Sequence, residues 1–343
     1  MSSSTSPAPT TLPFSIVDVF TRTPYKGNPL AVVNDLSGTL STTQMQLITR
    51  QFNLSETTFI NPPTLANAAY RLRSFLPDGK EVYGAGHNSL GALWWLAKHG
   101  HLDSIQSKDG EVKFNQEMGL DATPVTVTKG EDNELVVTLR QVPPKVHGVH
   151  SDPASLAQTL GINVADIGFE FGGKTIRDAQ VASTSTTHHL FVPVASEAVL
   201  NGISPKDREK LLAEILSVDP RGYGIYLFAP SPIQDVKAGT LSFQARFFSP
   251  GMSGEDPATG SAAGPLAAYL YHAGVLPVAP GEKAQISVVQ GLCVGRACLM
   301  TVGVELAGDG AAGGIDVSIS GGGVEVMTGE VVVPGEELGF REV

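Results

Sequence analysis

Several residue types are scarce in this chain of 343 residues, and each scarcity excludes a class of protein. There are two cysteines, Cys293 and Cys298, which cannot form a disulfide framework. They lie in a strand-like segment at a spacing that puts them on opposite faces, so we expect two buried, reduced thiols. Charged residues make up only 17% of the chain, and the net charge is −11. Nucleic acids and anionic membranes both require a basic surface, so neither is expected as a partner.

Long apolar runs are also missing. No stretch approaches the roughly 20 apolar residues that a membrane span requires, and the first residues lack the basic and apolar regions of a signal peptide. We therefore expect residues 1–12 to form a disordered tail and the protein to be cytoplasmic. Glycine is abundant, with 38 residues, and 42% of the chain is hydrophobic. This composition is typical of a globular chain with many turns, and its length allows two cores.

Strand-like segments dominate the pattern, and the predicted helices are few and well spaced. The helices are predicted at 41–52, 87–100, 153–160, 206–216 and 261–272. This arrangement indicates an α+β fold rather than a doubly wound sheet. The segment QVPPKVHG at 141–148 predicts a linker, because it holds two prolines and a glycine. We therefore expect an N-terminal half at 13–142, completed by a C-terminal strand at 335–343, and a C-terminal half at 150–334.

The stretch EVYGAGHNSLGALWW, which begins at Glu81, resembles a nucleotide-binding loop at first sight. Gly84, Gly86 and Ser89 have the spacing of G-x-G-x-x-G with its last glycine replaced. A dinucleotide site requires a buried apolar strand before the loop and an acidic residue about 20 positions later, at the end of a second strand. Here PDGKEVY precedes the glycines, and Asp103 follows no strand-like segment. The loop is therefore not predicted to bind a dinucleotide.

A second copy of the stretch explains it better. The pattern Arg-x-Phe-x-Pro at 73–77 recurs at 246–250, and Gly86, before the next helix, recurs as Gly260. Two strand–loop–glycine–helix units predict a duplicated architecture whose helix starts face each other across a cleft. Each start presents unpaired N–H groups and a partial positive charge, which favour an anion. Gly86, Gly260 and Ser261 are small enough to let the backbone approach a bound carboxylate.

Taken together, the motifs resemble the PhzF family of phenazine-biosynthesis-like proteins, which have the diaminopimelate-epimerase fold. The resemblance runs nearly end to end and includes QFNLSETTFI, EVYGAGHNSLGA, GEDPATGSAAGPLAAYL and QGLCVGR. It implies two pseudo-symmetric domains, each a barrel-like, mostly antiparallel sheet around a central helix, with the active-site cleft between them. It also implies a possible homodimer. The dipeptide Asn88-Ser89 departs from the family pattern and bears on substrate identity.

The resemblance also implies site residues. Glu56 would be the acid/base, His87 and Asp256 its catalytic partners, and Ser261 would bind substrate beside the glycines at the two helix starts. Each residue has a simpler interpretation: a solvated glutamate, a helix-capping histidine, a turn aspartate or an N-cap serine. We expect Glu56 to lie in an apolar pocket, where loss of solvation raises its pKa. The pair His188-His189 has no companion at metal-ligand spacing, so no metal is expected.

These features predict an isomerase without cofactor or metal that moves a proton on a small carboxylate-bearing substrate. Two alternatives stay open. A two-base epimerase would need a thiol at each glycine turn, and Cys293 and Cys298 lie at neither. A non-catalytic small-molecule-binding or scaffold protein could keep the same fold.

Overall fold

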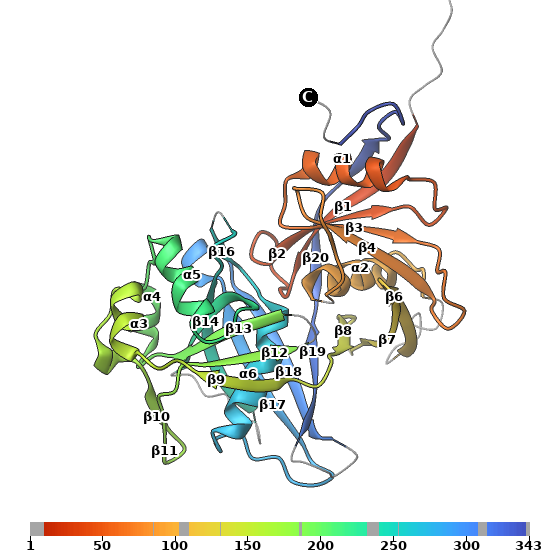
Figure 1. Cartoon of the computed structure of the whole chain (residues 1–343). Coiled ribbons are helices and arrows are strands. Elements are labelled where there is room, and N and C mark those ends of the chain that lie inside the picture. The colour runs from red at the N-terminus through yellow and green to blue at the C-terminus, as the bar shows by residue number, and fades with distance from the viewer. Residues whose placement is uncertain are drawn as a thin grey trace, which may run out of the picture.

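The computed structural model describes residues 10–84, 86–102, 110–130, 132–184, 187–231, 240–252, 254–307 and 314–340. Its strands form two lobes joined by a continuous mixed sheet (Figure 1). The strands of the N-terminal half are β1 (Thr11–Val19), β2 (Asn28–Asn34), β3 (Thr57–Asn61), β4 (Tyr70–Phe75), β5 (Glu81–Val82), β6 (Glu111–Met118), β7 (Asp121–Lys129), β8 (Leu135–Arg140) and β20 (Gly323–Val332). Its helices are α1 (Thr42–Phe52) and α2 (His87–Lys98).

The strands of the C-terminal half are β9 (Lys145–Val149), β12 (Gln180–Thr184), β13 (Thr187–Pro193), β14 (Gly222–Pro230), β15 (Thr240–Phe248), β16 (Glu255–Asp256), β17 (Lys283–Gln290), β18 (Cys298–Leu306) and β19 (Ile315–Gly321). A separate hairpin pairs β10 (Phe169–Phe171) with β11 (Lys174–Ile176). The helices are α3 (Pro153–Leu160), α4 (Glu197–Gly202), α5 (Arg208–Leu216) and α6 (Gly260–His272), with 3-10 turns η2 (Val164–Asp166) and η3 (Leu292–Val294).

Both halves repeat one strand order. The N-terminal order is β20-β1-β2-β3-β4-β6-β7-β8, and the C-terminal order is β9-β12-β13-β14-β15-β17-β18-β19. The parallel pairs occur at equivalent places, β2·β3 and β4·β6 in one half and β13·β14 and β15·β17 in the other. The last strands, β8 and β19, pair with each other and join the halves. The expected α+β fold with two pseudo-symmetric sheets is confirmed.

The chain crosses between the halves twice. After β8 it supplies β9, which pairs with β12, and after β19 it supplies β20, which pairs with β1 from Thr11–Val332 to Val19–Gly323. We expected the returning strand at 335–343, but it is β20, earlier in the chain. Pro334 and Gly335 follow β20. Proline has no amide hydrogen to donate and glycine weakens a strand, so the hydrogen-bond ladder does not continue past them. The pairing also places Thr11 in a strand rather than in the predicted tail, while residues 1–9 lie outside the described part.

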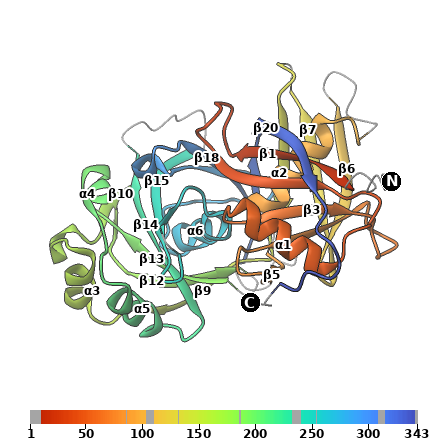
Figure 2. The same cartoon turned by 90° about the horizontal axis from the view of Figure 1, so that it is seen from above.

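The two central helices are apolar nearly all round, which is typical of helices enclosed by other elements. In α2 every residue but the last is buried, and in α6 nearly all are. Helix α6 lies inside the curved C-terminal sheet (Figure 2) and packs on β12, β18 and β19. Among the described residues, no helix combines the length and the apolarity needed to cross a bilayer.

The remaining helices cover the outer faces. Helix α1 begins at the capping box predicted from Ser41 and Gln44, and its buried Met45 and Ile48 pack over Phe59 of β3. Helices α3, α4 and α5 cover the outer face of β12, β13 and β14 with a separate apolar cluster. The N-terminal ends of the central helices, α2 and α6, lie where the two halves meet.

Candidate active site

The starts of α2 and α6 nearly touch. The N-cap of α2 is Gly86, and Gly260 begins α6. A Cβ built on Gly260 would lie 3.5 Å from Gly86 Cα and 3.2 Å from Ile319 Cδ1. The contact with Ile319 would be tighter than ordinary packing, while the contact with Gly86 would be an ordinary van der Waals contact. The prediction that the duplicated glycine turns face each other is confirmed.

Equivalent ion pairs hold the two loops that lead into these helices. Arg73 bonds Glu81 at 2.8 Å in one half, and Arg246 bonds Glu255 at 2.7 Å in the other. Each guanidinium also lies over a phenylalanine ring two residues further along its strand, at 5.1 and 4.9 Å from the ring centres. The arginines of the repeated Arg-x-Phe-x-Pro pattern thus brace the loops.

The start of α6 carries free backbone donors. The Thr259 amide donates to Gln290 Oε1 at 3.2 Å, and the amides of Ala262 and Ala263 donate to the Thr259 carbonyl at 3.0 Å. Between them, the amides of Gly260 and Ser261 have no acceptor among the described residues. Together with the helix dipole, these two donors favour an anion.

The start of α2 is capped in a different way. Asn88 Oδ1 accepts hydrogen bonds from the amides of Gly86 and Ser89 at 2.8 and 2.9 Å, and Asn88 Nδ2 donates to the Gly84 carbonyl at 3.0 Å. Asn88, one of the two departures from the family pattern, therefore caps this turn. The amides of His87 and Asn88, like those of Gly260 and Ser261, have no acceptor among the described residues, so both helix starts offer donors to an anion.

Glu56 lies immediately before β3 and approaches the first residue of α2. Its Oε2 is 3.2 Å from His87 Nδ1, and the two side chains are 19% and 11% exposed. The Oε2 atom is buried without a hydrogen-bond partner among the described residues. Burial raises the pKa of Glu56 to about 7. Burial lowers the pKa of His87, and the negative charge of Asp256 partly opposes that shift.

Asp256 comes to the same place from the C-terminal half, on β16. Asn28 Nδ2, from β2 of the N-terminal half, donates to its Oδ1 at 3.0 Å, and Thr259 Oγ1 donates to its Oδ2 at 2.6 Å. Burial raises the pKa of Asp256, while His87 and the Thr259 bond lower it. Both carboxylate oxygens therefore have donors, and the bond from Asn28 links the two halves.

Ser261 lies in the first turn of α6, where Thr259 is the N-cap, so the N-cap interpretation of Ser261 is wrong. Its Oγ is 3.1 Å from His189 Nε2. His188 points to the other face of β13, where its Nδ1 is 2.9 Å from Asp219 Oδ2. Among the described residues, no group of three His, Cys, Asp or Glu side chains is placed to hold a metal ion.

Several polar residues around the site were not predicted. Gln290 Nε2 donates to the Asp256 carbonyl at 2.7 Å, and Gln141 Nε2 donates to the Gly260 carbonyl at 2.9 Å. Partial burial and then the charges of Glu56 and Asp256 raise the pKa of Tyr223. A glutamine closing the apolar run ISVVQ was the available sequence signal for Gln290.

Neither cysteine belongs to the glycine turns at the starts of α2 and α6. Cys298 is buried at the start of β18, where burial raises its thiol pKa to about 12. Cys293 is exposed on η3, so the expectation of two buried thiols in one strand is wrong. The physical reason is that Gly291 and Gly295, with φ of 90° and 74°, turn the chain into a 3-10 turn.

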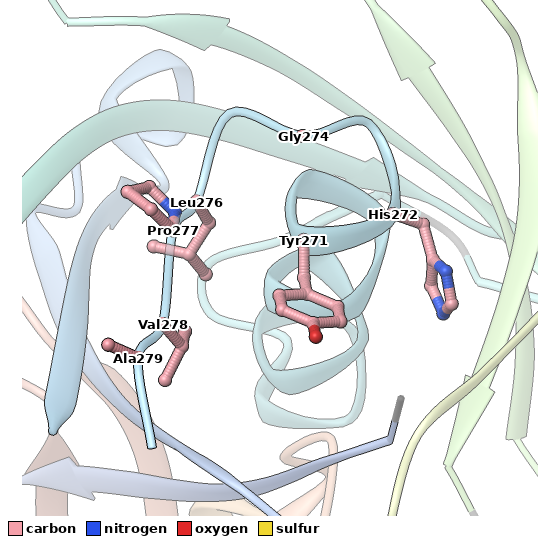
Figure 3. A pocket seen from close by; sticks show the side chains of 7 residues that line it. All are labelled: Tyr271, His272, Gly274, Leu276, Pro277, Val278 and Ala279. Carbon is pink, nitrogen blue, oxygen red and sulfur yellow. The ribbon is translucent and has the colours of Figure 1, made fainter. Parts of the chain in front are cut away.

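A surface hollow of about 500 Å³ lies at the opposite end of α6 (Figure 3). The Tyr271 ring projects from the last turn of the helix beside the returning segment. Its lining consists of Tyr271, His272, Gly274, Leu276, Pro277, Val278 and Ala279. This lining includes no carboxylate, whereas Glu56 and Asp256 lie near the start of α2 and the start of α6.

Known proteins resemble this chain in both sequence and fold. A family profile described as "Phenazine biosynthesis-like protein" matches residues 17–329. The trans-2,3-dihydro-3-hydroxyanthranilate isomerase of Pseudomonas chlororaphis is 29% identical over 323 residues, covering 93% of this chain and 99% of the relative. The enzyme of the same name from Pseudomonas aeruginosa is 30% identical over 319 residues, covering 92% and 98%. A PhzF-family phenazine biosynthesis protein of Bacillus anthracis has the same fold, with a TM-score of 0.77, 24% identity and coverage of 94% and 100%.

Proposed function

This chain belongs to the family of phenazine biosynthesis-like proteins, and from that premise we propose that it moves a proton on a small carboxylate-bearing substrate, with Glu56 as the acid/base and without a cofactor. The chain is an isomerase, as its relatives of 29–30% identity over almost their whole length are named. What the proposal adds is the substrate class, the group that carries the proton and the place where the charge is held.

The observation that carries the proposal is the buried contact between Glu56 and His87 beside the two helix starts. A general base works best with a pKa near the working pH, and burial brings Glu56 to about 7. Because burial lowers its pKa, His87 stays neutral and can donate a hydrogen bond without competing for the proton. A solvated structural glutamate would have neither a pKa near the working pH nor a buried, neutral histidine beside it.

The substrate carboxylate would lie on the free amides of Gly260 and Ser261. These donors are fixed by the helix, so they need no reorganisation as negative charge develops. Glu56 and this anion site come from opposite halves, which places the reacting carbon between them. A small carboxylate bound to these amides thus presents its adjacent carbon toward Glu56.

The reaction we propose conserves all atoms. Ionised Glu56 removes a proton from a carbon, and the electrons of that C–H bond enter the conjugated system to give an enolate-like anion. The amides at the α6 start stabilise the added charge. Protonated Glu56 then returns the proton to another carbon of the conjugated system on the same face, and the double bond shifts. General base catalysis supplies about 10² to 10⁴ in rate, and charge stabilisation and exclusion of water supply the rest.

The pseudo-symmetry supports one base rather than two. Thr57 of β3 pairs with Phe75 of β4, and Ile225 of β14 pairs with Phe248 of β15 at the equivalent place in the other half. Glu56 precedes Thr57, so its counterpart is the residue before Ile225, which is Gly224. A side chain at Gly224 would collide with the ring of Phe247, which fills that space. No thiol lies at either glycine turn, so a second base of the kind used in a two-base epimerase is not supported.

The first substrate to test is trans-2,3-dihydro-3-hydroxyanthranilate, after which the relatives are named. The purified protein should turn it over, or another cyclic or amino carboxylate in a panel, and incorporate deuterium from heavy water. Glu56→Gln keeps the shape but cannot take the proton, so turnover and incorporation should fall at least 10³-fold while binding persists. Wild-type rates in Glu56→Gln would overturn the assignment and leave Asp256 as the base. Binding without any exchange across the panel would favour the non-catalytic alternative.

A further inference from the structure

We propose that His189 is a positioning residue that directs the Ser261 hydroxyl hydrogen toward the substrate carboxylate. The inference rests on the proposed function, because it takes the start of α6 as the carboxylate site. It adds a third donor to that site and assigns its orientation to a side chain on β13.

His189 is held rigidly. Its side chain has no exposed surface, and its ring packs edge-to-face on Phe247, with centres 5.0 Å apart and planes at 83°. A second edge contact is made with the half-exposed Tyr223, at 6.0 Å. With the ring fixed in this way, Nε2 is 3.1 Å from Ser261 Oγ. The other ring nitrogen, Nδ1, is buried without a partner among the described residues.

This geometry decides where the ring hydrogen resides. If it were on Nδ1, a buried N–H would be left unpaired, and Nε2 would have to accept the Ser261 hydrogen. The Ser261 hydroxyl would then present only lone pairs to an incoming carboxylate, which repels it. If the hydrogen is on Nε2, the ring donates to Ser261 Oγ, and the hydroxyl hydrogen is free to point at the anion. An anionic ligand therefore favours the Nε2–H form.

The pairing is between neutral groups. Burial and then the neighbouring His188 lower the pKa of His189 to about 3, so the ring carries no charge over the working pH range. A cation at this position would also be opposed by the positive end of α6. His189 thus acts by orienting a donor rather than by adding charge to the site.

The consequence is a site of three converging donors. The amides of Gly260 and Ser261 are free, and the Ser261 hydroxyl adds a third hydrogen bond from the same turn. A carboxylate has enough lone pairs on its two oxygens to accept all three bonds, whereas an amide replaces one oxygen with a donor. The site should therefore discriminate between a carboxylate and its amide.

The first test measures binding of benzoate and benzamide to the whole protein. His189→Phe keeps a ring against Phe247 and Tyr223 but cannot donate, while His189→Gln keeps a donor. We expect His189→Phe and Ser261→Ala each to weaken benzoate binding about tenfold and benzamide binding less, because the neutral amide has a single oxygen and forms weaker hydrogen bonds, with His189→Gln closer to wild type. The double variant should lose little more than either single one. Equal losses for benzoate and benzamide would mean that His189 has only a packing role, and would overturn the proposal.

The second test needs no variant to fold. Nitrogen-15 NMR of histidine-labelled wild-type protein with bound benzoate should show His189 protonated at Nε2 only. Protonation at Nδ1 would overturn the inference, whatever the variants do. Failure of the wider function would look different, because Glu56→Gln would then retain exchange while the benzoate preference stayed intact. Wild-type protein that binds both probes equally overturns the carboxylate site and this inference together.

Discussion

At the scale of single residues, Glu56 shows how function and stability oppose each other. Burial raises its pKa from the ordinary value of 4.5 to about 7, so between these pH values the folded protein holds a proton that the unfolded chain has lost. Stability therefore falls as pH rises through this window. The full cost of the ionised form is on the order of 3 kcal/mol above pH 7.

Glu56→Gln should remove this cost. At pH 8 we expect the variant to be more stable than wild type by on the order of 2–3 kcal/mol, and at pH 4.5 the two should be nearly equal. Guanidinium unfolding at both pH values measures the difference. Equal stabilities at pH 8 would show that the carboxylate is hydrated in the folded protein, which would contradict its role as a desolvated base.

Gly260 is the second residue whose size decides the site. Gly260→Ala puts a methyl group 3.2 Å from Ile319 Cδ1 and 3.5 Å from Gly86 Cα, so the Ile319 side chain must shift slightly and the methyl group occupies space between the helix starts. We expect kcat/KM to fall ten- to hundredfold with a change of less than about 1 kcal/mol in the free energy of unfolding. Gly254→Ala is the matched control, because a methyl group there meets nothing within 4 Å. Equal activity of the two variants would show that the space beside Gly260 is not required.

At the scale of elements, the duplicated loops offer a natural comparison. The Arg246–Glu255 side chains are 7% and 4% exposed, while those of Arg73–Glu81 are 16% and 19% exposed. Arg246 also donates to the carbonyls of Leu200 and Ile203 near the end of α4. Removing Arg246 therefore leaves more buried groups without partners.

Arg246→Met should cost about 3–5 kcal/mol of unfolding free energy, and Arg73→Met about 1–2 kcal/mol. Urea unfolding followed by circular dichroism measures both. Each methionine keeps the apolar stem, so the difference reports the lost bonds. A larger loss in Arg73→Met than in Arg246→Met would contradict this account.

The elements also show how far the sequence alone could predict the structure. Local pattern was sufficient for α1, with its capping box at Ser41, and for the two glycine turns, because the signals lie within a few residues. It was not sufficient for the partner of Asp256, since Asn28 is 228 positions away and reaches it only through the register of two sheets. The orientation of His189 likewise depends on Phe247, on a different strand. Residues far apart in sequence therefore completed a site whose centre was predicted.

At the scale of the whole molecule, the N-terminal half depends on β20. Both tryptophans of the chain, Trp94 and Trp95, lie on α2 in this half, so their fluorescence reports on it alone. A chain ending at residue 322 should show emission shifted to long wavelength, because β1 loses one neighbour and the helix is uncovered. A chain ending at 333 keeps β20 and is the control. Blue-shifted emission from the shorter chain would show that β20 is dispensable.

The strand β20 follows the C-terminal half in the sequence but pairs with β1 of the N-terminal half, and this order affects how the chain folds during synthesis. A ribosome makes β1 to β8 first, but their last partner emerges only after residues 141–322. At 5–20 residues per second, the open edge of β1 waits on the order of ten to forty seconds. The C-terminal half needs only β9 to β19, which emerge in one uninterrupted run. The half that is begun first is thus the one finished last, and β1 keeps an open edge while the whole C-terminal half is made.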